Sequence, residues 1–523
     1  MKFAKLTFFF LLLSFCATAQ RATSSDAIRA YINELKEKYP VPELSKTEMY
    51  ADFDTLVSIM EYCNPQYLVR KKVTGYNMIE EMEAQRKHVE TCNNTLDFIK
   101  ILYKVLSLSL DPHCTDAGSE VWHYKSIYKK DIEINAITEA DYGINFNYRD
   151  DVFRKYTPFI NLLYIQGKYC IKNNTTFINN IDSVVIPAGT EILAFNQQPI
   201  ADIQSNVRNW YSRWDKDKNR YYHSMLYVTN SQNSISFSIN NIVKECEFEK
   251  YSQTRNDLSM NGYQVKWLDK DSIIYIVIPE MNYVKKWLKQ LKTNLLHYKK
   301  KSIKAVIVDI RGNYGGSDQV WVEVLEMVSK TAMEFPSYLI SNTDKEVIKR
   351  IQPSEITLLL EKEDSKIVFE CIDPNYQFRV FEKGTDSTVN SKRNLGYEGI
   401  IYLLVDEDVY SSAGAFSSLC TKNDSIKTIG MSTGKFLGGV TTPNIFILPH
   451  SRLIFRMELL LDAAGVSKAE DFYQDQINYP VTPSIEYYKY WHNPIRSYTI
   501  DEKAMYEHDE VFLKALEIIK SKN

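Results

Sequence analysis

Long hydrophobic runs and a strong charge of one sign are both missing from this 523-residue sequence. No stretch approaches the ~18 uninterrupted apolar residues that a membrane-spanning helix needs, so no membrane span is expected. The formal net charge is only −3 and no long basic run occurs. Nucleic acid is therefore not an expected partner.

The sequence also lacks the residue spacings that hold metal ions or disulfide frameworks. It contains no C-x-x-C or H-E-x-x-H motif, and its 8 cysteines are widely scattered. If Cys16 is lost with the N-terminal segment, an odd and dispersed set remains, which is not a disulfide framework. Cys63 and Cys92 could still pair, although buried free thiols are an equal alternative. We expect no metal ion and no other cofactor.

The first nineteen residues have the layout of a secretory signal peptide. Two lysines precede a short apolar run over residues 6–15, and Ala17-Thr18-Ala19 provides the small residues of a cleavage site. Cys16 could instead carry a lipid, but Phe15 is bulky where lipoprotein signals need a small residue. We therefore expect cleavage after Ala19 and export of the protein to the periplasm or beyond.

The pattern of apolar and polar residues changes twice along the rest of the chain. From Asp26 to about Leu110, apolar residues recur at three- and four-residue steps, as in Ala51–Met60 and Thr95–Leu106, which predicts helices. Asn94 or Thr95 is the expected N-cap of the second helix. Between residues 140 and 250, short alternating runs such as Ser234–Ile239 are typical of a small β domain.

From about residue 255, strands alternate with helices. Buried strands are expected at 272–278, 305–310 and 399–405, with helices at 283–299, 319–330 and from 412 onward. Such alternation predicts an α/β sheet with crossover helices, whose active residues lie just past the carboxyl ends of the strands. A final helix is expected at 509–520, with one apolar face that docks on the sheet.

One segment that follows a predicted strand could bind a negatively charged group. It reads Asp309-Ile-Arg-Gly-Asn-Tyr-Gly-Gly-Ser317, and the adjacent Gly315 and Gly316 would let the backbone approach a ligand closely. Such a turn can bind a phosphate or an oxyanion. No lysine follows Gly316 as a phosphate-binding loop requires, and a plain strand-to-helix turn is the alternative.

A second segment could supply a nucleophile. It reads Val405-Asp-Glu-Asp-Val-Tyr-Ser-Ser-Ala-Gly-Ala-Phe416 and places two serines at the start of a helix of small residues. The amino end of a helix stabilises developing negative charge, and the next N–H group can point at the same site. Taken alone, Ser411 or Ser412 would more often be only a helix N-cap.

Together the two segments resemble the paired signatures of the tail-specific and tricorn-core serine peptidase family. Its members have a strand ending in Asp-x-Arg-x-Asn-x-Gly-Gly and, after an insert, a helix that opens Ser-Ala-x-Glu with the nucleophile first. Ser412-Ala413-Gly414 matches this opening, which favours Ser412 over Ser411. Ala415 stands where the family has glutamate.

Weaker matches extend the resemblance over nearly the whole chain. Residues 430–433 match a Gly-x-x-Thr turn, and residues 111–115 resemble the family's Asp-Gly-His-Thr, with Pro112 in place of glycine. Residues 186–200 resemble the core of a PDZ domain, in which a glycine turn, an apolar strand and an Asn-x-x-Pro turn lead to a short helix. Another small β domain is the alternative.

The resemblance implies a multidomain α+β fold. The implied parts are a signal peptide at 1–19, an N-terminal helical domain at 20–118, a PDZ-like β domain at 140–250, an α/β peptidase core of the ClpP/crotonase-like type at 255–500 and a C-terminal helix at 501–523. It further implies an endopeptidase that binds polypeptide tails and cuts by acyl transfer. Its oxyanion hole would use the N–H groups of Gly315 or Gly316 and of Ala413.

The general base has two candidates. One family branch uses a lysine in a Thr-Phe-Gly-Lys turn, and Lys435 lies one position early in such a turn. A lysine base must be made neutral by burial. The tricorn-like branch uses the histidine of the Asp-x-His segment, here His113, and an imidazole needs little perturbation to act near neutral pH. We therefore favour His113.

The orienting carboxylate is expected several tens of residues after the nucleophile. Glu470, Asp471 and Asp475 lie in that window, and Asp475 is our choice. The missing glutamate and the displaced lysine keep an alternative open, a catalytically weakened adaptor that only binds peptides. An esterase is less favoured because the chain has no G-x-S-x-G motif. Neither the natural substrate nor the oligomeric state follows from these residues.

Overall fold

The computed structural model describes most of the chain. The described residues are 19–118, 136–153, 159–179, 182–215, 217–228, 233–253, 263–351, 378–387, 394–432, 444–463, 466, 469–472, 477–491 and 500–522. The expected signal segment, including Cys16, lies outside them up to residue 18. Within the described ranges, no helix combines the length and apolar character needed to cross a membrane. Cys63 and Cys92 are both buried, and no disulfide joins them.

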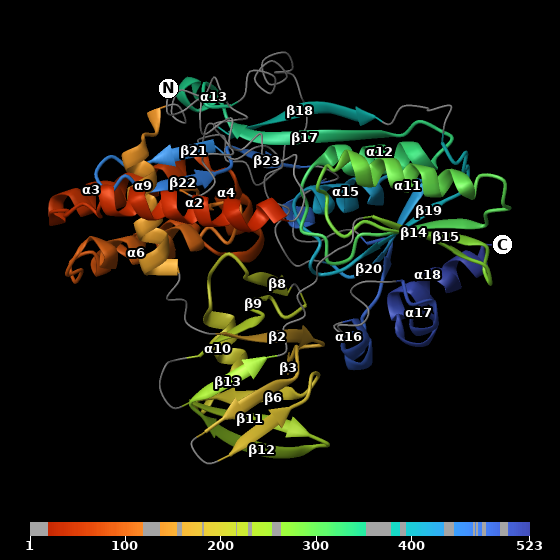
Figure 1. The fold of residues 1–523 in the computed structure, drawn as a ribbon, viewed down its shortest axis with the longest axis horizontal. Helices are drawn as coiled ribbons and strands as arrows, with labels where there is room; N and C mark the ends of the chain where they lie inside the picture. Colours follow the sequence, from red (N-terminus) through yellow and green to blue (C-terminus); the bar gives the residue numbers. More distant parts are fainter. Residues whose placement is uncertain are drawn as a thin grey trace.

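Helices form the N-terminal part, at the left of Figure 1. They are α2 (Ala19–Lys38), α3 (Lys46–Cys63), α4 (Gln66–Thr74), α5 (Met78–Glu83), α6 (Thr95–Ser107) and, later in the chain, α9 (Glu139–Tyr148). Asn94 caps α6, because its side chain accepts a hydrogen bond from the Asp97 N–H. Ser45 and Glu48 form a reciprocal capping box at the start of α3.

A β region lies below the helices in Figure 1. Its largest sheet has the order β10-β2-β3-β6-β11-β12, with the short β7 beside β6. The strands are β2 (Phe159–Ile165), β3 (Lys168–Ile171), β6 (Glu191–Phe195), β7 (Gln198–Pro199), β10 (Met225–Tyr227), β11 (Asn233–Ile239) and β12 (Ile242–Phe248). The short helix expected after the Asn-x-x-Pro turn is α10 (Ile200–Asn206).

Smaller elements complete this region. They are the sheet β13-β4-β5, made of β4 (Thr175–Ile178), β5 (Ser183–Ile186) and β13 (Lys250–Gln253), and the hairpin of β8 (Arg213–Asp215) and β9 (Arg220–Tyr222). The β character expected from the alternating runs is therefore present.

The expected α/β sheet lies at the right of Figure 1. Its order is β14-β15-β16-β19-β20-β24, formed by β14 (Gln264–Leu268), β15 (Ile273–Val277), β16 (Ala305–Asp309), β19 (Ile401–Val405), β20 (Ile426–Gly430) and β24 (Tyr479–Pro480). Only the edge strand β14 runs antiparallel; the other neighbours pair in parallel. Parallel neighbours bring the carboxyl ends of β16 and β19 to one edge of the sheet.

Helices cover both faces of this sheet. Alternate strand residues point to opposite faces, so Ile274 packs with α11 (Lys285–His297), α12 (Asp318–Val328) and α15 (Ser412–Thr421). Its neighbour Ile273 packs with the C-terminal α18 (Glu510–Ser521), whose predicted apolar face is buried. The helices α16 (Ile485–Trp491) and α17 (Glu502–His508) lie between β24 and α18 in the chain.

The chain does not pack as consecutive domains. The strands β21 (Asn444–Ile447) and β22 (Ile454–Met457) leave the α/β core, and β22 pairs with β1 (Thr115–Asp116) after the N-terminal helices. Phe446 and Phe455 consequently share a hydrophobic core with Phe53 of α3 and Leu102 of α6. The expected boundaries at 20–118 and 255–500 do not include this pairing of β22 with β1. The local sequence pattern carries no information on the pairing of strands that are more than 300 residues apart.

A further sheet bridges the two parts. It has the order β18-β17-β23, made of β17 (Glu334–Asn342), β18 (Phe378–Ser387) and β23 (Leu460–Asp462). The strand β23 follows β22 closely in the chain, so the same returning segment is tied to both the helical part and the core.

A buried ion pair fixes the carboxyl end of β16. The Arg311 guanidinium donates two hydrogen bonds to Asp309 at 2.9 and 2.7 Å, and two to Asp509 at 2.7 and 2.8 Å. The arginine side chain is fully buried. Asp509 also caps α18 by accepting the Phe512 N–H. The arginine of the first motif therefore joins the last helix to the edge of the sheet that carries the glycine turn.

Loss of this arginine should destabilise the protein strongly. Arg311→Ala leaves two buried carboxylates without their partner, which costs about 3–5 kcal/mol in other proteins. Urea unfolding followed by tryptophan fluorescence should show a lowered midpoint. The matched control is Lys330→Ala, which breaks an exposed pair with Glu398 and should change the midpoint little. Equal midpoints for the two variants would contradict this role of Arg311.

Candidate active site

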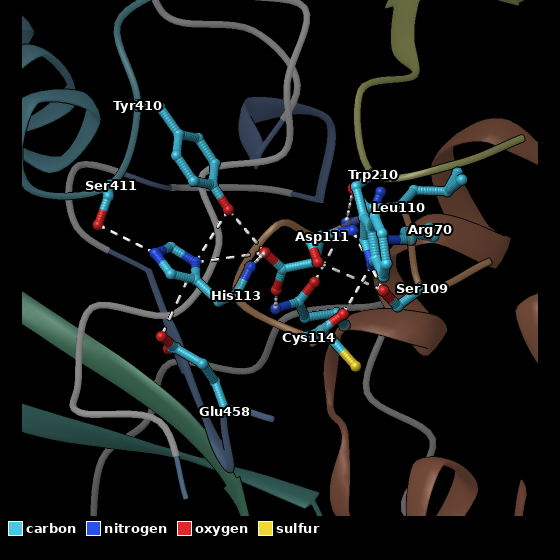
Figure 2. Close-up of polar contacts among 11 residues, drawn as sticks. Arg70, Ser109, Leu110, Asp111, His113, Cys114, Trp210, Tyr410, Ser411 and Glu458 are labelled. Atoms are coloured by element: carbon cyan, nitrogen blue, oxygen red, sulfur yellow. Dashed lines mark hydrogen bonds and ion pairs between the residues drawn. The ribbon is translucent and has the colours of Figure 1, made fainter. Parts of the chain in front are cut away.

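The predicted base lies beside a serine hydroxyl. His113 follows α6 and precedes β1, whereas Ser411 precedes α15 in the α/β core. The Nε2 atom of His113 is 3.1 Å from the Oγ atom of Ser411 (Figure 2). Two segments separated by 298 residues thus meet within hydrogen-bonding distance.

The serine preferred from the sequence lies elsewhere. The Ser412 hydroxyl donates a 2.6 Å hydrogen bond to Asp318 Oδ1 at the start of α12, and Ser412 is only 2% exposed. Ser412 is the first residue of α15, and Ser411 is its N-cap. The hydroxyl within hydrogen-bonding distance of His113 is therefore that of Ser411, whereas the sequence-based choice was Ser412. Residues adjacent at a helix start point in different directions, which the motif match did not resolve.

The backbone at Ser411 is strained. Its φ and ψ are +53° and −129°, a conformation that side-chain-bearing residues rarely adopt. Non-glycine residues held in this way cluster at functional sites, including the sharp turns that present nucleophiles. Gly315 makes the turn possible, because a Cβ atom there would lie 2.6 Å from Ser411 Cβ and 2.7 Å from the Tyr410 carbonyl oxygen.

The backbone amides around Ser411 are partly occupied. The Gly315 N–H donates to Asn313 Oδ1 at 2.8 Å, and the Ala413 N–H donates to the Tyr410 carbonyl at 3.2 Å. Two of the three predicted oxyanion donors are thus engaged within the protein. Among the described residues, no acceptor faces the N–H group of Gly316 or that of Ser412.

The other ring nitrogen of His113 faces three oxygen atoms. Its Nδ1 atom is 2.9 Å from Tyr410 Oη, 3.2 Å from Asp111 Oδ1 and 3.8 Å from Glu458 Oε1. The Tyr410 hydroxyl itself donates a 2.6 Å hydrogen bond to Asp111 Oδ1. Figure 2 shows Asp111 on the side of the ring opposite Ser411, with Tyr410 above the ring and Glu458 below it.

Burial and charge act against each other in this cluster. Burial alone would raise the pKa of Asp111, but hydrogen bonds from His113 and Tyr410 hold it well below its usual value. Burial works to lower the pKa of His113, yet the negative charges of Glu458 and Asp111 raise it above its usual value. Arg456 opposes that rise. Burial raises the pKa of Glu458 to about 8, against the attraction of His113.

Residues of α4 hold the loop that carries His113. Gln66 donates a hydrogen bond to Asp111 Oδ2, and the buried Arg70 donates to the Leu110 carbonyl at 3.2 Å. Leu110 adopts a positive φ of +56°. The Asp111 carboxylate then accepts the His113 backbone N–H at 3.0 Å, which closes a tight turn in front of the histidine.

Of the remaining predicted site residues, Glu470 and Asp471 are described, and neither contacts His113. Lys435 and Asp475 lie outside the described residues. Glu470 and Asp471 belong to a short helix (Ala469–Phe472) that packs on α4, and the carboxylates in contact with His113 are those of Asp111 and Glu458. Within the described ranges, no group of three or more His, Cys, Asp or Glu residues could hold a metal ion.

Sequence reasoning missed Glu458 although a signal was present. Glu458 follows β22 in the run 453–461, which is otherwise apolar except for Arg456, and it is only 3% exposed. A carboxylate inside an apolar run is rarely buried without a partner or a function. The orienting carboxylate was expected at residues 470–475, and Glu458 lies before them in the chain.

This chain was compared with known protein families, curated sequences and solved structures. The family model described as Peptidase family S41 matches residues 272–461, which hold the glycine turn, Ser411 and Glu458. No curated protein sequence matches the chain. Mature CPAF has a similar solved structure, with a TM-score of 0.56 and 12% identity over 91% of this chain and 98% of that one.

Two other solved structures are also similar. Mature CPAF complexed with lactacystin has a TM-score of 0.55 at 12% identity, over 91% of this chain and 99% of that one. A putative peptidase from Parabacteroides merdae has a TM-score of 0.43 at 13% identity, over 91% and 98%. The CPAF likeness shows a shared fold.

The family match and the site together define a serine-type peptidase. Residues 272–461 carry the likeness to peptidase family S41, and a peptidase of this kind acts on polypeptides.

The pH dependence of activity should report the cluster around His113. A general base works in its neutral form, so kcat/KM should rise as pH passes the raised pKa of His113, above the ordinary value of about 6.5. Glu458→Gln removes the carboxylate whose negative charge raises the pKa of His113, so it should move this acid limb to lower pH. A kcat/KM profile of both proteins tests this; an unmoved limb would mean that the charge of Glu458 does not act on His113.

Proposed function

We propose that this protein is an endopeptidase in which Ser411 attacks the scissile carbonyl and His113 acts as general base. The observation that carries the proposal is the 3.1 Å contact between His113 Nε2 and Ser411 Oγ at a strained turn. A base must lie within about 2.6–3.2 Å of the proton that it removes. In this assignment Ser411 takes the role that the sequence pattern suggested for Ser412.

The reaction follows from this geometry. As the bond from Ser411 Oγ to the carbonyl carbon forms, Nε2 of His113 takes the hydroxyl proton. The same proton then passes to the leaving amine when the peptide bond breaks. Water, activated by the freed Nε2, hydrolyses the acyl-enzyme and releases Ser411.

The oxyanion would be held by backbone amides. The N–H groups of Gly316 and Ser412 are the candidates, since those of Gly315 and Ala413 already have acceptors within the protein. Gly316 is one of the two glycines expected from the sequence, whereas Ser412 takes the place expected for Ala413. One such donor typically contributes about 3 kcal/mol to stabilisation of the transition state.

Two carboxylates would stabilise the imidazolium that forms on His113. Asp111 Oδ1 lies 3.2 Å from Nδ1 and stays ionised, because its pKa is held low. Glu458 Oε1 lies 3.8 Å away and adds to the field in its ionised form, which a positive charge on His113 favours against the effect of burial. Both are buried, so their charges act through a medium of low polarisability and are felt more strongly than in water.

We propose further that the β region recognises substrate tails in the manner of a PDZ-like domain, beside a ClpP/crotonase-like core. An extended tail would add as a strand to a sheet edge, with its carboxylate held by backbone N–H groups. The strand β10 already pairs with β2, so a tail that adds at β2 must displace β10. Arg213 of β8 pairs with Asp408 at 2.5 Å, which supports a close link between this region and the turn before Ser411.

The two serines should differ sharply in reactivity. A fluorophosphonate probe should label the wild-type protein and Ser412→Ala at Ser411, whereas Ser411→Ala should remain unlabelled. Peptide turnover should fall by several orders of magnitude in Ser411→Ala, because the nucleophile is lost. Mass spectrometry of the labelled peptide gives the modified residue.

The two serine variants also show which results would contradict the proposal. Labelling at Ser412, or full turnover by Ser411→Ala, would contradict the assignment. Absence of labelling in every protein would favour the adaptor that only binds peptides.

Tail recognition predicts dependence on a free carboxylate at the substrate end. A substrate with an amidated C-terminus should show a KM raised about tenfold or more, since a charge-assisted hydrogen bond contributes roughly 1.5–3 kcal/mol. Turnover of matched peptides with free and amidated ends measures this. Equal KM values for the two peptides would remove the tail-specific part of the proposal.

A further inference from the structure

We propose that Tyr410 is a positioning residue whose hydroxyl holds His113 in the tautomer needed for catalysis. The inference rests on the proposed function, because it assumes that His113 is the base for Ser411. It adds a group that the family resemblance did not suggest. The residue lies directly before the nucleophile in the chain and contacts the base through its side chain.

The direction of the hydrogen bonds assigns the proton on His113. The Tyr410 hydroxyl has one proton, and it donates that proton to Asp111 Oδ1 at 2.6 Å. Its oxygen can therefore only accept from His113 Nδ1, 2.9 Å away. Nδ1 must then carry the ring proton, which leaves Nε2 free to accept the proton of Ser411.

Other oxygen atoms near Nδ1 are less well placed to fix the ring. Glu458 Oε1, at 3.8 Å, lies beyond hydrogen-bonding distance and acts through its charge alone. Asp111 Oδ1, at 3.2 Å, is farther than Tyr410 Oη and already accepts the tyrosine hydroxyl and the His113 backbone N–H. The tyrosine hydroxyl is the nearest acceptor.

The tyrosine ring also packs against the face of the imidazole and restrains its position. The two rings stack with centroids 4.9 Å apart and an angle of 22° between their planes. The Tyr410 backbone N–H donates to the Asn313 carbonyl at 3.1 Å, which anchors the residue to the glycine turn. Tyr410 therefore fixes the base, while its own backbone is fixed to the segment that surrounds Ser411.

The discriminating variant is Tyr410→Phe, which keeps the stacked ring and removes only the hydroxyl. We expect kcat to fall about 10- to 100-fold, the range seen when groups that orient a functional histidine are removed. KM for a peptide substrate should stay within about twofold, since the hydroxyl does not face the substrate. Nitrogen-15 NMR of labelled histidine should show a loss of the Nδ1–H tautomer of His113, with His113→Ala identifying the signal.

The matched control is Tyr397→Phe. Tyr397 is a core tyrosine whose hydroxyl contacts the carbonyls of Lys304 and Ile400, remote from His113. It should lose some stability and keep wild-type kcat and the wild-type tautomer signal. If Tyr410→Phe behaves like this control, the hydroxyl is merely structural and the inference is wrong.

Failure of the proposed function would look different. If His113→Ala and Ser411→Ala both retain turnover, the base and nucleophile are misassigned, whatever Tyr410→Phe does. If both variants are inactive and Tyr410→Phe retains wild-type kcat and tautomer, the proposed function stands and only the role of Tyr410 falls.

Discussion

The hydrogen bond from Tyr410 to Asp111 is the contact on which the active-site geometry depends. Asp111 belongs to the loop after the N-terminal helices, and Tyr410 to the turn after a central strand of the α/β sheet. Neither part contains a complete site. Because the bond is short and buried, separating the two parts would remove one of the hydrogen-bond donors of the buried Asp111 carboxylate, which is costly. The catalytic arrangement is therefore also an interface between parts of the fold.

The pairing of a strand from the C-terminal part with one from the N-terminal part holds that interface together. The returning segment β21–β22 pairs with β1 beyond the N-terminal helices, and Glu458 follows directly after it. His113 lies two residues before β1, so one short ladder positions both the base and a carboxylate next to it. A site assembled from paired strands holds its side chains more precisely than one built on free loops.

On the serine side of the site, the strained backbone of Ser411 is held in place by its surroundings. The positive φ of Ser411 costs free energy, and such strain persists only where the surroundings fix it. Here the surroundings are the glycine turn and the helix α15, while Arg311 ties that turn's strand to the C-terminal helix through two buried carboxylates. A buried polar network thus stabilises the segment from which the nucleophile projects. Peptide cleavage needs this rigidity because the base must meet the hydroxyl within a few tenths of an ångström.

The amino-acid sequence alone determined the local elements and the kind of chemistry. Periodicity placed α6, α12, β16 and β19 within a few residues, and the glycine pair, the serine pair and His113 pointed to acyl transfer. What it could not decide was which neighbour of a pair faces the site. Ser411 and Ser412 are chemically identical, and the backbone conformation at the start of α15 directs one hydroxyl to His113 and the other to Asp318. Glu458 and Tyr410 gained their places only through contacts between segments far apart in the chain, and those contacts depend on strand pairing and burial, which no short stretch of sequence encodes.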